Sequence, residues 1–274
     1  MTRLILLAIL ALFVMPAPLI LFAVLINWRV ICEKTPSQNL KELGSTFFSA
    51  GLSLFVAIST RPFTFLDTIP LKNKNRNNQP ILMVHGLYHN KVAWILMKHR
   101  LNALGFSNIH TWQYNSFTTS YPELVLKLRS EIDRIYKTNN HKIILVGHSL
   151  GGLLISGATS APDTKDKALG LITIGTPFKG SILAAIAPGR LGKSLHPESS
   201  LFLGDNKITF PNDIPKTAII SPTDEMVLPW ANLAPETSRW TIKNSPALGH
   251  VAMLYSRRVS RIVANCIHGM IHIK

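Results

Sequence analysis

Cysteine is nearly absent from this chain. Two cysteines, Cys32 and Cys266, occur among 274 residues, so they can form one disulfide bond at most. A framework of several disulfide bonds, which holds many small secreted domains together, is therefore excluded. Because Cys32 also lies close to a long apolar segment, cysteine usage leaves the cellular compartment open.

Acidic residues are also scarce. The sequence has 14 Asp and Glu against 29 Lys and Arg, for a formal net charge of +15. Such an excess favours an anionic partner, either nucleic acid or an acidic lipid surface. The sequence has no zinc-finger spacing, no aromatic RNA-binding signature and no long basic run, so we expect no nucleic-acid partner. We expect an anionic membrane instead.

The first charge-free run is long enough to cross that membrane. Residues 4–26 are apolar throughout, and a helix of this length spans a hydrocarbon core of about 30 Å. The alternative is a cleaved signal peptide with its apolar core at residues 4–14 and Ala17 as the last residue removed. Pro18 would then follow the cleavage site, where we expect poor processing. The apolar run also continues well beyond that site, to residue 26. We therefore expect residues 1–28 to be a single-pass anchor in a bacterial inner membrane, with its orientation open.

Residues 29–78 are expected to form a membrane-proximal helical segment and a linker. A second apolar stretch, residues 47–58, is short for a span and contains two serines and a glycine. It predicts an interfacial helix, a re-entrant helix or a helix packed on the protein. The polar run at residues 72–79 predicts a solvated loop before the first strand.

Residues 79–274 alternate between strand-like and helix-like segments. Strands are predicted at residues 81–84, 109–114, 142–147, 169–175, 217–221 and 239–243, and the central ones are near-continuous apolar runs. Helical patterns lie between them at residues 92–104, after the capping box at 120–123, and at 150–159, and a last helix is predicted over 251–267. This order predicts an α/β fold, in which parallel strands are joined by right-handed crossovers and the sheet is covered on both faces.

The third strand ends in a turn that carries a serine. Residues 147–151 read Gly-His-Ser-Leu-Gly, after the apolar run IILV and before a helix. This is the nucleophile-elbow pattern, in which Gly147 and Gly151 leave space for a strained turn. The turn presents the Ser149 hydroxyl at a helix N-terminus, where the amide of Leu150 faces a developing oxyanion.

A serine nucleophile needs a base and an acid that orients the base. His250 lies in a loop between the last strand and the last helix, where the base of this fold belongs. His196 lies in an irregular insertion, and we expect His268 and His272 to follow the final helix in solvent. Asp224 and Glu225 both follow the fifth strand. Asp224 is the expected acid, with Glu225 as the alternative, although we expect Glu225 to face solvent.

The second oxyanion donor is expected in the loop after the first strand, VHGLYHN at residues 84–90. Gly86 permits the turn, and the amide of Leu87 would then face the serine. We expect His85 and His148 to hold loops by hydrogen bonds, and His89 to lie at the mouth of the pocket.

Five segments in this order make the chain resemble the α/β-hydrolase lipases. They are VHGLY (84–88), VGHSLGGL (146–153), LITIGTPFKGS (171–181), SPTDEMV (221–227) and GHVAML (249–254). The sequence is most similar to small bacterial triacylglycerol lipases and to acyl-ester hydrolases of the inositol-deacylase type. The resemblance implies an α/β-hydrolase fold, a catalytic triad of Ser149, Asp224 and His250, and oxyanion donors at Leu87 and Leu150.

Two departures from the family limit what it implies. The insertion between Ser181 and Pro215 is short, so we expect a small lid at most. The calcium-site aspartates of larger bacterial lipases have no counterpart that we can place, so we expect no metal and no cofactor.

The expected function is a membrane-anchored serine hydrolase that cleaves lipid acyl esters through an acyl-enzyme intermediate. A thioesterase or an acyltransferase with the same triad is an alternative, because no feature of the sequence identifies the acyl acceptor. A catalytically inactive lipid-binding scaffold tethered to the membrane is the alternative from a different class. Acyl chain length, lipid class and oligomeric state are left open.

Overall fold

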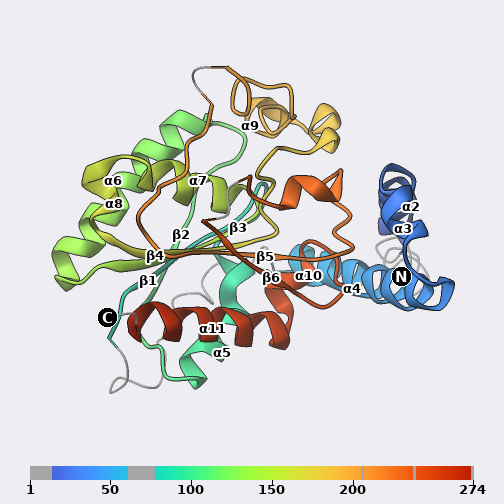
Figure 1. The fold of residues 1–274 in the computed structure, drawn as a ribbon. Coiled ribbons are helices and arrows are strands. Elements are labelled where there is room, and N and C mark those ends of the chain that lie inside the picture. The colour runs from blue at the N-terminus through green and yellow to red at the C-terminus, as the bar shows by residue number, and fades with distance from the viewer. Residues whose placement is uncertain (1–13, 61–77, 205–206, 237–238, 273–274) are drawn as a thin grey trace, which may run out of the picture.

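A parallel β-sheet forms the centre of the molecule (Figure 1). The computed structural model describes residues 14–60, 78–204, 207–236 and 239–272. Within them, six strands lie in the order β2-β1-β3-β4-β5-β6. Their bounds are β1 Ile81–Val84, β2 Ile109–Trp112, β3 Ile143–His148, β4 Ala168–Ile174, β5 Lys216–Ile220 and β6 Thr241–Asn244.

Every strand pair in this sheet is parallel. In the middle, Val84 of β1 lies opposite Gly147 of β3, which brings the loops after both strands to one edge. All residues of β1 and β3 are buried because helices cover both faces, whereas the edge strand β6 is exposed. The predicted α/β architecture is thus confirmed.

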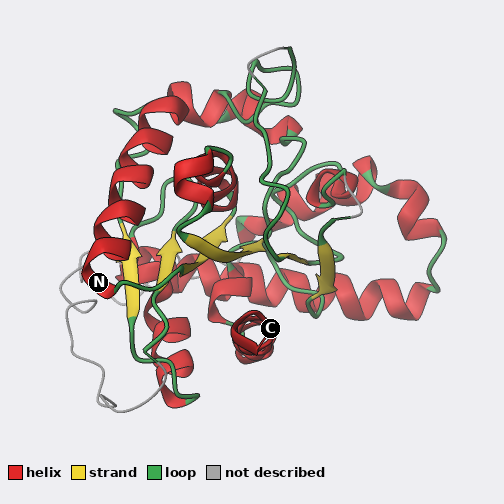
Figure 2. Cartoon of the chain, turned by 60° about the vertical axis from the view of Figure 1, so that its left-hand side comes forward, coloured by secondary structure: helices red, strands yellow, loops and turns green. Residues whose placement is uncertain are grey.

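Helices cover the two faces of the sheet (Figures 1 and 2). One face carries α6 (Tyr121–Asn139), α7 (Leu150–Thr159) and α8 (Pro162–Lys165), and the other carries α5 (Ile95–Ala103) and α11 (Arg257–His272). Shorter helices lie in the connections: η2 Lys91–Trp94, η3 Ile182–Ile186, α9 Gly189–Lys193, η4 Trp230–Leu233 and α10 Ala252–Tyr255. η3 and α9 belong to the short insertion between Ser181 and Pro215, for which we expect a small lid at most.

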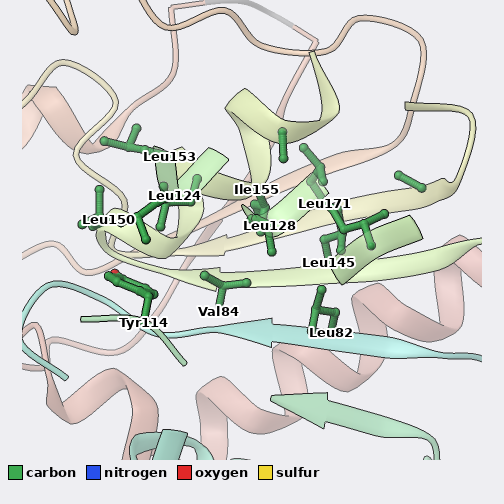
Figure 3. Close-up of a cluster of buried hydrophobic side chains, with 14 of the residues drawn as sticks. Leu82, Val84, Tyr114, Leu124, Leu128, Leu145, Leu150, Leu153, Ile155 and Leu171 are labelled. Atoms are coloured by element: carbon green, nitrogen blue, oxygen red, sulfur yellow. The ribbon is translucent and has the colours of Figure 1, made fainter. Parts of the chain in front are cut away.

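Helix α6 shows how the sequence pattern forms the core. Its capping box is present, and Leu124, Leu128, Ile132 and Ile135 are all fully buried on one face. Figure 3 shows Leu124 and Leu128 among the side chains of Leu145 and Leu171 from the sheet and of α7. Full burial of one such side chain contributes about 1.5–3 kcal/mol.

The end of the chain differs from its prediction. The expected single helix is interrupted at Ser256, whose backbone is extended, and so divides into α10 and α11. Helix α11 then continues to His272, so His268 and His272 lie within it, and the His268 ring packs on Phe106 at 4.8 Å. The helix passes Gly269 because one more turn buries Met270 in the core.

Three helices precede the first strand: α2 (Pro16–Ile26), α3 (Trp28–Cys32) and α4 (Pro36–Thr60). Residues 4–13 of the expected anchor lie outside the described residues, and α2 is the described remainder of that apolar run. Among the described residues, one helix is long and apolar enough to cross a membrane, and it is Pro36–Ser59 of α4. The stretch at residues 47–58 is therefore part of a longer helix.

Candidate active site

Ser149 lies at the junction of β3 and α7 in a left-handed backbone conformation. Its φ and ψ angles are 53° and −124°, which non-glycine residues rarely adopt. Three hydrogen bonds hold it there: its amide donates to Ile174 O at 2.8 Å, and its carbonyl accepts from Gly152 N at 2.9 Å and Thr176 Oγ1 at 3.1 Å. Such strain at a single serine is typical of functional sites.

The neighbouring glycines allow this turn by their lack of a side chain. A Cβ atom on Gly147 would lie 2.5 Å from the backbone of Gly151, and one on Gly151 would lie 2.2 Å from Val84 O. Gly86, in the loop after β1, faces the serine so closely that a Cβ there would meet Ser149 Cβ at 2.9 Å. The loop after β1 and the serine turn are therefore in direct contact.

His250 and Asp224 form a buried pair. His250 Nδ1 lies 2.7 Å from Asp224 Oδ2, and the exposed fractions of the two residues are 3% and 0%. The other carboxylate oxygen, Asp224 Oδ1, accepts the amides of Met226 and Val227, both at 2.9 Å. Asp224 is thereby held as an acceptor, so that His250 Nδ1 donates to it.

The charges around His250 decide its protonation. Burial alone would lower the pKa of His250, but the carboxylate of Asp224 and its hydrogen bond raise it, and Glu225 adds to this effect. The net result is a pKa above the ordinary value for histidine, because the surrounding carboxylates favour the imidazolium.

Glu225 does not face solvent, contrary to our expectation. It is 5% exposed, and its Oε2 accepts the backbone amide of His250 at 2.9 Å. Burial and the nearby Asp224 raise the pKa of Glu225 to about 7. The sequence shows that Asp224 and Glu225 are adjacent. Only the folded loop shows that Asp224 faces the imidazole ring of His250, whereas Glu225 faces its backbone amide.

Two further histidines support the loops, as expected. His148 Nε2 donates to the carbonyl of His250 at 3.2 Å, and burial keeps the pKa of His148 well below its usual range. His85 Nδ1 donates to Gly86 O at 2.8 Å, and its Nε2 accepts from Tyr114 N at 3.3 Å. Burial lowers the pKa of His85 to about 4, so both rings are neutral near pH 7.

An apolar cavity of about 400 Å³ brings several of the candidate residues together. Gly86, Leu87, His89, Ser149 and His250 line it. Leu150 is the first residue of α7, and the amides of a first helical turn have no partner within their helix. A larger and more open hollow, of about 720 Å³, lies between α6 and the insertion and contains none of these residues.

Sequence reasoning missed part of this cavity wall. Met15 and Leu19 from the N-terminal apolar segment line it, and so do Met226 and Val227 beside Asp224. The four-residue spacing of Met15 and Leu19 fits one helix face, but a run without polar residues gives no sign of which face is used.

Tyr88 was also missed as a structural residue of the loop after β1. It has a φ of 59°, its amide donates to Ser116 Oγ at 2.9 Å, and its hydroxyl donates to the carbonyl of Pro188. Tyr88 therefore joins the loop that carries Leu87 to the small insertion. By contrast, Phe178 of the lipase-like segment packs on Trp240 in the core.

Solved structures of lipases share this fold. The lipase BlEst2 of Bacillus licheniformis, in its mature form, is 17% identical with a TM-score of 0.60, over 73% of this chain and 95% of that one. Aspergillus fumigatus lipase B is 16% identical with a TM-score of 0.58, over 70% and 54%. The monoacylglycerol lipase of Paleococcus ferrophilus is 16% identical with a TM-score of 0.51, over 71% and 97%. At such identities the likeness shows the fold.

The sequence itself matches a family over more than half of its length. Comparison with curated proteins gives no match. The Alpha/beta hydrolase family, however, matches residues 81–262, from the first strand into the last helix. With its parallel sheet, its strained serine turn and this match, the chain belongs to the Alpha/beta hydrolase family.

Proposed function

We propose that this protein is a membrane-anchored serine hydrolase that cleaves carboxylic esters of lipids. One observation carries the proposal: the imidazole that Asp224 holds at 2.7 Å lines the same cavity as the strained Ser149. An activated nucleophile requires a base and a group that orients the base. Ser149 and His250 line the cavity, and the buried Asp224 is hydrogen bonded to His250.

The proposed reaction has two halves. The Ser149 oxygen attacks the acyl carbon while His250 takes its proton, and the proton then passes to the leaving alcohol as the ester C–O bond breaks. Water attacks the resulting acyl-enzyme with His250 again as the base, which releases the carboxylic acid and restores the serine. Asp224 holds the tautomer of His250 and stabilises its imidazolium form. The amides of Leu87 and Leu150 would stabilise the oxyanion, and loss of one such donor typically slows turnover about 100- to 1000-fold.

The cavity favours an acyl chain as the substrate group. Its volume of about 400 Å³ falls within the range of ligand pockets, and aliphatic side chains such as Leu19, Leu183 and Val227 dominate its lining. Among the structures that share the fold are two lipases and a monoacylglycerol lipase by name. These points together support lipid esters over polar esters.

The surface of α4 supports a membrane location. Thr46, Ala50 and Ser53 on its inner face are almost fully buried, whereas Phe48 and Leu52 are 68% and 55% exposed. A helix with small and hydroxyl side chains toward the protein and large apolar ones outward is typical of contact with lipid. With the net charge of +15 and the apolar run at residues 4–26, this favours an anionic bilayer. We propose residues 1–28 as anchor, 29–78 as membrane-proximal segment and 79–274 as catalytic domain.

A fluorophosphonate probe tests the proposal, because it labels activated serines. We expect the full-length protein in detergent to be labelled, and Ser149→Ala to lose both labelling and hydrolysis of p-nitrophenyl esters. The loss in kcat should be on the order of 10⁵- to 10⁶-fold. Ser160→Ala, at the other end of α7, is the matched control and should behave as the wild type.

Other outcomes would change the proposal. Absence of labelling in the wild type would favour the inactive lipid-binding scaffold. Labelling with faster turnover of thioesters than of esters, or with transfer of the acyl group to an added alcohol, would favour a thioesterase or an acyltransferase.

A further inference from the structure

Helix α4 contacts the loop that carries His250. Ser49 Oγ accepts the amide of Gly249 at 3.0 Å, and Ser45 Oγ donates to the carbonyl of Ala247 at 2.8 Å. Ser49 also donates to Thr46 O within its own helix at 3.1 Å, which directs its lone pairs toward Gly249. Two hydroxyls one helical turn apart thus hold the main chain just before His250.

The same helix contacts the loop that carries Asp224. The hydroxyl of Thr46 is hydrogen bonded to that of Thr223, the residue before Asp224, and the two residues are 0% and 2% exposed. Thr46 donates to Glu42 O at 3.0 Å, so Thr223 is the donor in the bond between the threonines. One face of α4 therefore holds both loops.

The helix approaches the loop more closely than a side chain would allow. A Cβ atom on Gly249 would lie 2.7 Å from Ala50 Cβ and 3.0 Å from Ala50 Cα. Because Gly249 and Ala50 are both small, the helix lies close enough to the loop for Ser45 and Ser49 to form their hydrogen bonds.

Hydrogen bonds from side chains to main-chain atoms hold each residue of the loop at 247–250. Ser221 Oγ donates to Leu248 O at 2.6 Å and accepts from Leu248 N at 3.2 Å. Beyond it, Glu225 accepts the His250 amide and His148 donates to the His250 carbonyl. Of these contacts, α4 supplies those at 247 and 249. A buried amide or carbonyl that lost its partner would be left unsatisfied, so the loop would shift to find another partner.

We propose that α4 is a positioning element of the active site, through which Ser45, Thr46 and Ser49 hold His250 and Asp224 in register with Ser149. This inference rests on the proposed function, because it assigns α4 a part in the same reaction. It implies that turnover requires α4 to be docked, and therefore that a helix with a lipid-facing outer surface controls the base and the acid directly.

The test compares Ser49→Ala with Ser59→Ala in the full-length protein in detergent. Ser59 is an exposed serine of the same helix and serves as the matched control. With a short, water-soluble p-nitrophenyl ester, we expect Ser49→Ala to lower kcat about 10-fold and to leave KM within twofold, because misplacement of a catalytic group slows the chemical step. Rates are expressed per active site titrated with fluorophosphonate, so that unfolded protein does not count.

Two further measurements separate positioning from simple destabilisation. Loss of register between His250 and Asp224 should move the acidic limb of the kcat/KM profile to lower pH, and Ser49→Thr, which keeps the hydroxyl, should restore most of the rate. Ser45→Ala, at an exposed position, should show a smaller effect in the same direction. An active wild type with an unchanged kcat and pH profile in Ser49→Ala overturns the role of α4, whereas a wild type without labelling overturns the proposed function itself.

Discussion

At the scale of single residues, two carboxyl groups share one histidine. Asp224 accepts two backbone amides besides the imidazole, whereas Glu225 accepts the amide of His250. Hydrogen bonds to a carboxylate stabilise its charged form, and burial beside another charge destabilises it. Burial and the neighbouring Asp224 raise the pKa of Glu225 to about 7, so Glu225 keeps its proton to a higher pH than an ordinary glutamate does.

The pH profile of hydrolysis should reflect this arrangement. Imidazolium cannot take the proton of Ser149, so kcat/KM falls as pH drops through the pKa of His250. Because the buried carboxylates raise this pKa, we expect the midpoint of the acidic limb above pH 6.5. Asp224→Asn removes the charge and should move the midpoint to lower pH, with a loss in kcat of about 10⁴-fold. A midpoint that stays in place in Asp224→Asn would contradict the pairing.

Glu225→Gln tests the second carboxyl. Glutamine keeps an oxygen that can accept the His250 amide but carries no charge. The pKa of Glu225 is raised from 4.5 to about 7 in the folded protein, so its contribution to stability is full below pH 4.5 and is lost as pH rises through 7. We therefore expect the Tm of Glu225→Gln, relative to wild type, to increase from pH 5 to pH 8. Thermal unfolding of both proteins across this pH range measures the trend.

At the scale of elements, the contact between α7 and β1 determines where the serine lies. The start of α7 approaches the end of β1 so closely that Gly151 has no room for a methyl group beside Val84 O. The same contact places the loop after β1, with Leu87, beside the serine turn. The position of Ser149 at this edge of the sheet therefore depends on glycine at one helix position.

Gly151→Ala should disrupt this contact. The backbone of β1 or α7 must shift, so we expect a destabilisation of about 1–3 kcal/mol and loss of fluorophosphonate labelling. Gly269→Ala is the matched control, because a Cβ atom on Gly269 in α11 would have no neighbouring atom within 4 Å among the described residues. It should stabilise the protein by about 0.5–1 kcal/mol, since alanine favours a helix over glycine. Thermal unfolding measures both changes.

At the scale of the whole molecule, the N-terminal helices and the hydrolase domain form one structure. Ala23 and Ile31 pack with Leu228 and Leu233, which follow the loop that carries Asp224. Trp230 N donates to Asn27 Oδ1 at 2.9 Å. The cavity wall includes Met15 and Leu19. The segment expected to serve as an anchor and linker therefore also contributes to the cavity and to the loops around it.

The outer face of α4 gives a prediction at this scale. Phe48→Ser with Leu52→Ser changes exposed side chains only, so hydrolysis of a soluble ester in detergent should remain within twofold of wild type. Hydrolysis of an ester lipid within anionic vesicles should fall several-fold, because apolar contact with the bilayer is lost. Leu126→Ser, at an exposed site on α6, is the control. Equal activity on vesicles in the double variant would exclude α4 as a lipid-contacting helix.

Much of the fold and of the candidate site follows from short windows of sequence. Apolar runs between turns predicted the central strands, and the four-residue pattern of Leu124 and Leu128 predicted the buried face of α6. The glycines around Ser149 predicted a turn with no room for neighbouring side chains. The structure leaves no space for a Cβ atom at Gly147 or Gly151. Periodicity and main-chain sterics are local, so residues close in sequence are sufficient to express them.

Other features arise only when distant segments pack. Ser45 is hydrogen bonded to Ala247, and Asn27 to Trp230, although about two hundred residues separate each pair. The local sequence around one residue of such a pair does not predict the other. The orientation of the Glu225 side chain depends on the path of the loop at His250. Which apolar side chains of α4 remain exposed depends on which face of the helix packs on the protein. Hydrogen bonds and burial at such contacts are properties of the assembled chain, because each is formed by surfaces that folding alone brings together.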